Sequence, residues 1–212
     1  MVGALLRGEG RFAVDRQRVP WGALAGALVV AGWVYGAAMG LSDGRALQAL
    51  YSALKVPALL VISTLVCLPN FYAVNAVLGL RDDFAAAVRG VVAAQATVAV
   101  TLASLAPVTL LAYVSSDDYA FAGLLNGAVF ALGAAAGQLT LNRHYRRLVE
   151  RDPRHRVGRV AWLALYVFVA VQLAWVLRPF VGAPGRPTRF FREDAWSNAY
   201  VVVVETVLGL LR

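Results

Sequence analysis

Few side chains in this chain have the types and the spacing that chemistry would need. The sequence contains two histidines and a single cysteine. His144 and His155 lie among arginines and far from Cys67, which argues against a zinc site. We also find no phosphate-binding glycine loop, no zincin helix and no nucleophile elbow. The sequence therefore predicts no catalytic residue, no cofactor site and no metal site, and we expect that the protein is not an enzyme.

Charged side chains gather instead around a Pro/Gly/Arg-rich hook, residues 181–192. The arginines of this region and two aspartates elsewhere in the chain are Arg178, Arg186, Arg189, Arg192, Asp117 and Asp118. We predict that the hook folds back over the end of the molecule where the aspartates emerge, with Arg178 or a neighbour paired to one of them. The alternative is that the same arginines bind an anion or a lipid phosphate, since a guanidinium matches both.

The uncharged runs of the sequence contain amides and hydroxyls in place of ionisable groups. Glu205 is the only acid inside such a run, whereas proton-coupled transporters usually bury a carboxylate or histidine within their spans. Six amides lie in these runs: Asn70, Asn75, Asn126, Gln95, Gln138 and Gln172. Amides at membrane depth more often tie helices together than bind a substrate.

The composition sets the environment in which these side chains must be positioned. Of the 212 residues, 60 % are hydrophobic and 15 % are charged, and the mean hydropathy is +0.65. Soluble domains carry about 25 % charged residues. Backbone groups inside a membrane must be satisfied within the segment, which favours helices. We therefore predict an all-α fold, an integral membrane helical bundle.

Five uncharged or nearly uncharged runs are long enough to cross a bilayer, which takes about 20 helical residues. They lie at residues 21–41, 56–80, 84–114, 119–141 and 160–177. The last segment, residues 195–212, places Asn198, Glu205 and Arg212 on one side of a helix and apolar residues on the other. This pattern is typical of an amphipathic helix at the interface. We predict five transmembrane helices plus a C-terminal amphipathic helix, with six spans as the alternative.

The fourth run contains the most small residues on one half of its helical wheel. This half also carries two of the amides, and its candidate contact residues are Gly123, Asn126, Gly127, Gly133, Gly137 and Gln138. Small residues let helix backbones approach closely, and amides can then bond across the contact. We expect the tightest helix contact of the bundle here, made either within this chain or with another protein.

The basic residues predict the orientation. Thirteen of the twenty Lys and Arg residues fall on one side if the N-terminus is cytoplasmic, and this side then carries most of the net charge of +8. The predicted order is a cytoplasmic basic segment at 1–20, a transmembrane bundle at 21–180, an outer loop at 181–194 and the amphipathic helix at 195–212. Such a face attracts anionic membrane lipids, whereas nothing here indicates nucleic acid.

Several segments resemble a bacterial family of multipass membrane proteins, familiar from cyanobacteria. They are Lys55-Val56-Pro57-Ala58-Leu59, Cys67-Leu68-Pro69-Asn70-Phe71-Tyr72, Ala106-Pro107-Val108-Thr109, Leu124-Leu125-Asn126, Gln172 to Phe180, and Gly182-Ala183-Pro184-Gly185. The likeness covers roughly residues 45–200, is specific at the hook and implies a bacterial inner (cytoplasmic) membrane. Proteins of this family have no established activity. A weaker likeness is to Yip-type membrane proteins, which act in membrane trafficking and shaping.

Two functional hypotheses follow. The first is a membrane scaffold or an accessory subunit that binds a membrane protein partner or a second copy of itself. The second is a lipid-handling protein or a passive solute pathway that uses the amide-lined interior and the hook arginines. A polar cavity linking Asn70, Asn126 and Gln172 would favour the second hypothesis. A filled interior with an exposed small-residue face would favour the first.

Overall fold

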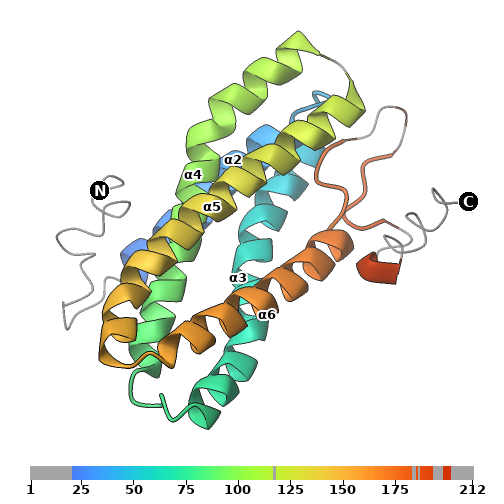
Figure 1. Cartoon of the computed structure of the whole chain (residues 1–212). Coiled ribbons are helices and arrows are strands. Elements are labelled where there is room, and N and C mark those ends of the chain that lie inside the picture. Colours follow the sequence, from blue (N-terminus) through green and yellow to red (C-terminus); the bar gives the residue numbers. More distant parts are fainter. Residues whose placement is uncertain (1–20, 117, 183–184, 186, 193–197, 202–212) are drawn as a thin grey trace, which may run out of the picture.

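The computed structural model describes residues 21–116, 118–182, 185, 187–192 and 198–201. In this part of the chain all regular structure is helical, and five long helices make up most of it (Figure 1). Their bounds are α2 Trp21–Gly40, α3 Ala46–Val77, α4 Phe84–Ser115, α5 Tyr119–Arg151 and α6 His155–Val176. The predicted N-terminal segment 1–20 and residues 195–197 and 202–212 of the predicted amphipathic helix lie outside the described residues.

The five helices are long and apolar enough to cross a membrane. The shortest, α2, has 20 residues and measures about 30 Å at 1.5 Å per residue, which is the thickness of a bilayer's hydrocarbon core. The predicted fold class, an all-α bundle of five potential spans, is therefore confirmed. Pro69 and Pro107, which interrupt two of the predicted spans, lie inside α3 and α4 without ending these helices.

Three of the predicted helix boundaries are wrong. α3 begins at Ala46, ten residues before the uncharged run 56–80. The basic segment 142–159 is also mostly helical, because α5 continues to Arg151 and α6 already begins at His155. Tyr145 and Leu148 in this segment pack in a hydrophobic cluster, while Arg146 pairs with Glu150 one turn away on the solvent side. Amphipathic packing thus extends α5 beyond its uncharged run.

Successive helices run in opposite directions, so the start of one helix and the end of the preceding one lie at the same end of the bundle. The hook end contains the last residues of α2, α4 and α6, the first residues of α3 and α5, and the hook itself. The basic end contains the opposite termini. α2 packs along α3 and α4, and α5 packs along α4. α6 packs mainly on α3; it meets α5 near the basic end and diverges from it toward the hook end (Figure 1).

Glycines allow the closest helix contact. Gly32, Gly36 and Gly40 follow one another at four-residue intervals along α2 and face α3. A Cβ at Gly36 would overlap the Ser52 carbonyl oxygen and would lie 2.8 Å from Ala53 Cα. The backbones of α2 and α3 are therefore in direct contact, as expected of helices joined through a row of small residues.

Candidate functional site

The small-residue helix α5 has two faces with different surroundings. Gly133 and Gly137 face α4, where a Cβ would meet the side chains of Leu102 and Val98 at 3.1 and 2.5 Å. Gly123 and Gly127 instead have no atom within 4 Å of a Cβ built on them. Sequence reasoning placed all four glycines on one half-wheel, but the structure brings only the first pair into the bundle.

The open glycines belong to a longer row on the exposed face of α5. We call this the α5 row; its members are Gly123, Gly127, Ala131 and Ala134, and all four are exposed. Nearer the basic end, the same face of α5 carries Leu141 and Tyr145, which pack in one cluster with Trp162 of α6. The α5 row thus begins where α6 no longer covers α5 (Figure 1).

Asn126 lies one turn from the α5 row but points into the bundle. Its Oδ1 accepts a hydrogen bond from Tyr35 Oη at 2.8 Å. Its Nδ2 donates to Tyr113 Oη at 2.5 Å and to the Ala122 carbonyl at 2.7 Å. The amide therefore joins α5 to α2 and α4 and is fully used inside the chain. Gln138, the other predicted contact amide, is half-buried on α5.

The segment that leads into the hook is anchored by three side chains of α3. Gln48 Nε2 donates to the carbonyls of Pro179 and Phe180, both at 3.2 Å. Ser52 Oγ donates to the Phe180 carbonyl at 2.5 Å, and Lys55 Nζ donates to the Pro179 carbonyl at 2.7 Å. We call these three residues the α3 anchor; their spacing places them on one face of the helix.

Lys55 is the unusual member of the α3 anchor, because its side chain is fully buried. Besides bonding to the Pro179 carbonyl, its ammonium lies over the ring of Phe190 in the hook. The distance from Nζ to the ring centroid is 4.7 Å. A buried charge is costly unless it is solvated by the protein, and a carbonyl dipole and an aromatic face together do this. Sequence reasoning missed this role, although the spacing of Gln48, Ser52 and Lys55 on one helix face is a signal that could have indicated it.

The predicted ion pair of Arg178 or a neighbour with Asp117 or Asp118 stays a prediction, and the described side chains of this region make other contacts. Asp118 caps α5, since its Oδ1 accepts from the Ala120 amide at 2.8 Å. Arg178 lies over the ring of Trp175, 3.1 Å from Cζ to the centroid. Arg192 Nη2 donates to Tyr119 Oη at 3.4 Å, and Arg189 is exposed. Asp117 and Arg186 lie outside the described residues. The hook thus reaches the start of α5 through the contact between Arg192 and Tyr119.

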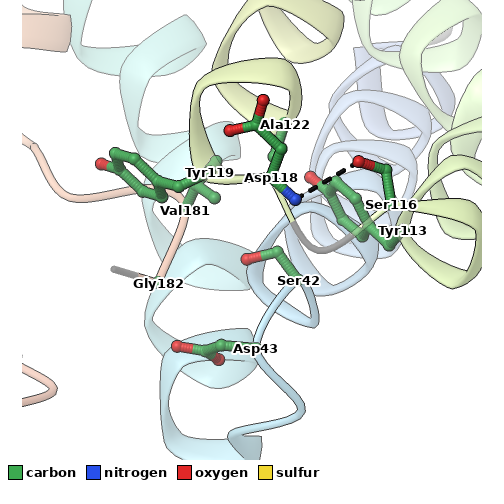
Figure 2. Close-up of a pocket in the computed structure, with 9 residues that line it drawn as sticks. All are labelled: Ser42, Asp43, Tyr113, Ser116, Asp118, Tyr119, Ala122, Val181 and Gly182. Carbon is green, nitrogen blue, oxygen red and sulfur yellow. Dashed lines mark hydrogen bonds between the residues drawn. The ribbon is translucent and has the colours of Figure 1, made fainter. Parts of the chain in front are cut away.

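A pocket of about 130 Å³ opens at the hook end (Figure 2). Its walls come from the α2–α3 turn, the last turn of α4, the first turn of α5 and the start of the hook, and its lining residues are Ser42, Asp43, Tyr113, Ser116, Asp118, Tyr119, Ala122, Val181 and Gly182. Asp43 already pairs with Arg45, and Asp118 caps α5. The two carboxylates are therefore engaged within the chain. Among the described residues, no group of three or more His, Cys, Asp or Glu side chains could hold a metal ion.

The basic end is held by charged side chains. Asp83 lies 3.2 Å from Nε2 of the fully buried His155 and 3.6 Å from Nη1 of Arg151, so α4 is tied to α5 and α6. Arg154 donates to the Leu78 carbonyl at 2.8 Å and pairs with Asp152. Hydrogen bonds from Arg154 hold the pKa of Asp152 at about 2, below its ordinary value of 3.8. These contacts join the α3–α4 loop to the α5–α6 loop.

The fold defines a class, a helical bundle with five potential membrane spans. The chain matches no protein-family model, no curated protein and no solved structure.

Proposed function

We propose that the protein is an integral membrane scaffold or accessory subunit that binds a transmembrane helix of a partner along the α5 row. In this proposal the basic end faces the cytoplasm of a bacterium, the N-terminus is cytoplasmic, and the bundle lies in the inner membrane. The observation that carries the proposal is the open pair Gly123 and Gly127, around which no atom lies within 4 Å of a Cβ position.

The glycine row on α2 supports the proposal that the α5 row binds a helix. Gly32, Gly36 and Gly40 have the same four-residue spacing, and there α3 comes into backbone contact. An interior glycine costs a helix about 1 kcal/mol relative to alanine, so two exposed glycines in α5 weaken the helix unless a partner uses them. Gly22 and Gly26 of α2 are also open, but bulky, exposed Val30 follows them at the next position of that row. The α5 row is the longer one.

The interior amides favour a scaffold over a solute pathway. Asn126 is bonded to Tyr35 and Tyr113, and Gln172 Oε1 accepts from the Ala199 amide at 3.0 Å. Asn70 is exposed on α3. The three amides lie in separate environments, so they do not form the shared polar cavity that a pathway would need.

The test is to extract the tagged protein from its native membrane in polymer nanodiscs and to identify co-purifying proteins by mass spectrometry. We expect a stoichiometric partner, or a second copy detected by cross-linking of two differently tagged chains. Gly127→Leu, which adds bulk to the α5 row, should abolish the association. Ala128→Leu adds the same bulk about 100° away on the exposed surface of α5 and should leave the association unchanged.

Two results would overturn the proposal. One is a wild-type chain that purifies alone and shows no cross-link between tagged copies. The other is an association that survives Gly127→Leu as well as it survives Ala128→Leu. Monodisperse size-exclusion profiles and unchanged helical circular dichroism of both variants would show that the comparison is between folded proteins.

A further inference from the structure

A second open surface lies on α2, α3 and α4, away from the α5 row. It is an apolar groove of about 180 Å³, and its lining residues are Ala25, Leu28, Val29, Val61, Thr64, Leu65, Leu68, Val92 and Gln95. Thr64 donates its hydroxyl to the Leu60 carbonyl of its own helix at 2.7 Å. Gln95 is therefore the one lining residue among these nine whose side chain can offer a hydrogen-bond donor that its own helix does not use.

The side-chain amide of Gln95 makes a hydrogen bond through its oxygen. The side chain is only 5 % exposed, and its Oε1 accepts a hydrogen bond from Tyr166 Oη of α6 at 3.0 Å. No hydrogen bond joins its Nε2 to another described residue, and this atom is not fully enclosed by the protein. An amide donor at membrane depth has no water to bond, so an unpaired N–H there is costly. A molecule in the groove that presents an acceptor to Nε2 would remove this cost.

The depth of the groove restricts what that acceptor can be. Ala25 to Val29 lie four to eight residues beyond Trp21, which is about 6–12 Å along the helix. Trp21 begins α2, and a tryptophan at the end of a span marks the interface with the headgroups. Gln95 lines the groove together with these residues and so lies within the hydrocarbon. The ester carbonyls of bulk phospholipids lie nearer the interface.

We propose that this groove binds a lipid-soluble carbonyl compound with the chemistry of an isoprenoid quinone. Its tail lies against the aliphatic walls, and a carbonyl oxygen accepts a hydrogen bond from Gln95 Nε2. Tyr166 acts as a positioning residue, because its bond to Oε1 turns the donor end of the amide toward the groove. This site goes beyond the proposed scaffold role and uses a different face of the bundle.

The experiment uses the full chain in phosphatidylcholine nanodiscs and two probes. Decylubiquinone carries ring carbonyls on a ten-carbon chain, and decylbenzene carries the same chain on a ring without a carbonyl. We expect saturable binding of decylubiquinone above the level of empty nanodiscs and none of decylbenzene. Gln95→Leu should weaken decylubiquinone binding about tenfold, the effect of one hydrogen bond. Gln138→Leu, an amide substitution on α5, should leave it unchanged.

A second variant tests the groove without touching its polar group. Val29→Trp fills the groove from α2, and we expect it to abolish binding while Gln95 stays in place. Equal binding of the two probes would show a site for acyl chains only and would overturn the proposal. Decylubiquinone binding that is unaffected by both Gln95→Leu and Val29→Trp would overturn it as well.

Discussion

Two rows of small residues in this bundle have the same spacing and opposite surroundings. On α2, Gly32, Gly36 and Gly40 bring α3 so close that a Cβ at Gly36 or Gly40 would overlap its backbone. On α5, a Cβ at Gly123 or Gly127 would meet nothing within 4 Å. The comparison teaches that a glycine row specifies a close helix contact without specifying which helix makes it. The partner of the α2 row is in this chain, and we propose that the partner of the α5 row is not.

The largest effect is expected from a methyl group in the filled row. Gly36→Ala places a Cβ against Ser52 and Ala53, whose backbone atoms cannot move without separating α2 from α3. Overpacking of this kind should lower the free energy of unfolding by about 3 kcal/mol, measured by thermal unfolding in detergent. Gly26→Ala on the same helix, where a Cβ meets nothing, is the control and should not destabilise the protein. Equal stability of the two variants would contradict the direct contact of α2 with α3.

Alanine substitutions at the open glycines of the α5 row should raise the free energy of unfolding, whereas Gly36→Ala lowers it. Gly123→Ala and Gly127→Ala each replace a poor helix former by the best one and create no clash within the chain. The free energy of unfolding of the isolated protein should rise by up to about 1 kcal/mol per substitution. The same detergent assay measures it. A loss of stability would mean that both positions are packed inside the bundle, and the contrast between the two rows would disappear.

A smaller loss of stability is expected from a change in the α3 anchor. Ser52 takes part in both the α2–α3 contact and the anchor, through different atoms. The Ser52 backbone contacts Gly36, whereas its hydroxyl holds the Phe180 carbonyl. Ser52→Ala should cost about 1 kcal/mol, the net value of one hydrogen bond, and should speed proteolytic cleavage in the hook. Ser104→Ala is the control, because its hydroxyl bonds only to the Val100 carbonyl of its own helix. Identical cleavage of both variants would show that the hook does not depend on this bond.

The smallest effect is expected at the basic end, where Asp152 and Arg154 pair in a turn without a glycine row. Because the folded pKa of Asp152 lies below its ordinary value, the pair stabilises the turn above pH 4, and this contribution is lost as the pH falls toward 2. Arg154 donates its amide proton to Asp152 Oδ1, so hydrogen exchange of that amide should accelerate across this range after correction for the intrinsic rate. Asp152→Asn should remove the pH step. If the pH step persists in Asp152→Asn, it arises from the titration of another group.

The sequence was sufficient to predict the five long apolar helices, because uncharged runs of 18 residues or more have few alternatives to a helix that could span a membrane. It misplaced the helix ends at the basic end, since residues 142–151 alternate apolar and basic side chains around a helix and read as a loop when only charge is considered. The half-wheel of α5 was identified, but the structure splits it: Gly133 and Gly137 face α4, whereas no neighbouring helix covers Gly123 and Gly127. Local sequence patterns do not encode this difference. The α3 anchor joins Lys55 to Pro179 across 124 residues, a distance over which a sequence pattern carries no pairing information.

The separation of 124 residues between Lys55 and Pro179 also limits the order in which the parts of the chain can fold. Lys55 is synthesised 124 residues before the Pro179 carbonyl that accepts its hydrogen bond, so α2 and α3 are made before this acceptor exists. Until Pro179 has been made, this ammonium lacks the carbonyl that binds it in the folded chain. The hook end can close only when translation of the fifth helix is complete. Folding of this end is therefore a late event, while the contact between α2 and α3 through Gly32 and Gly36 can form as soon as these two helices have been made.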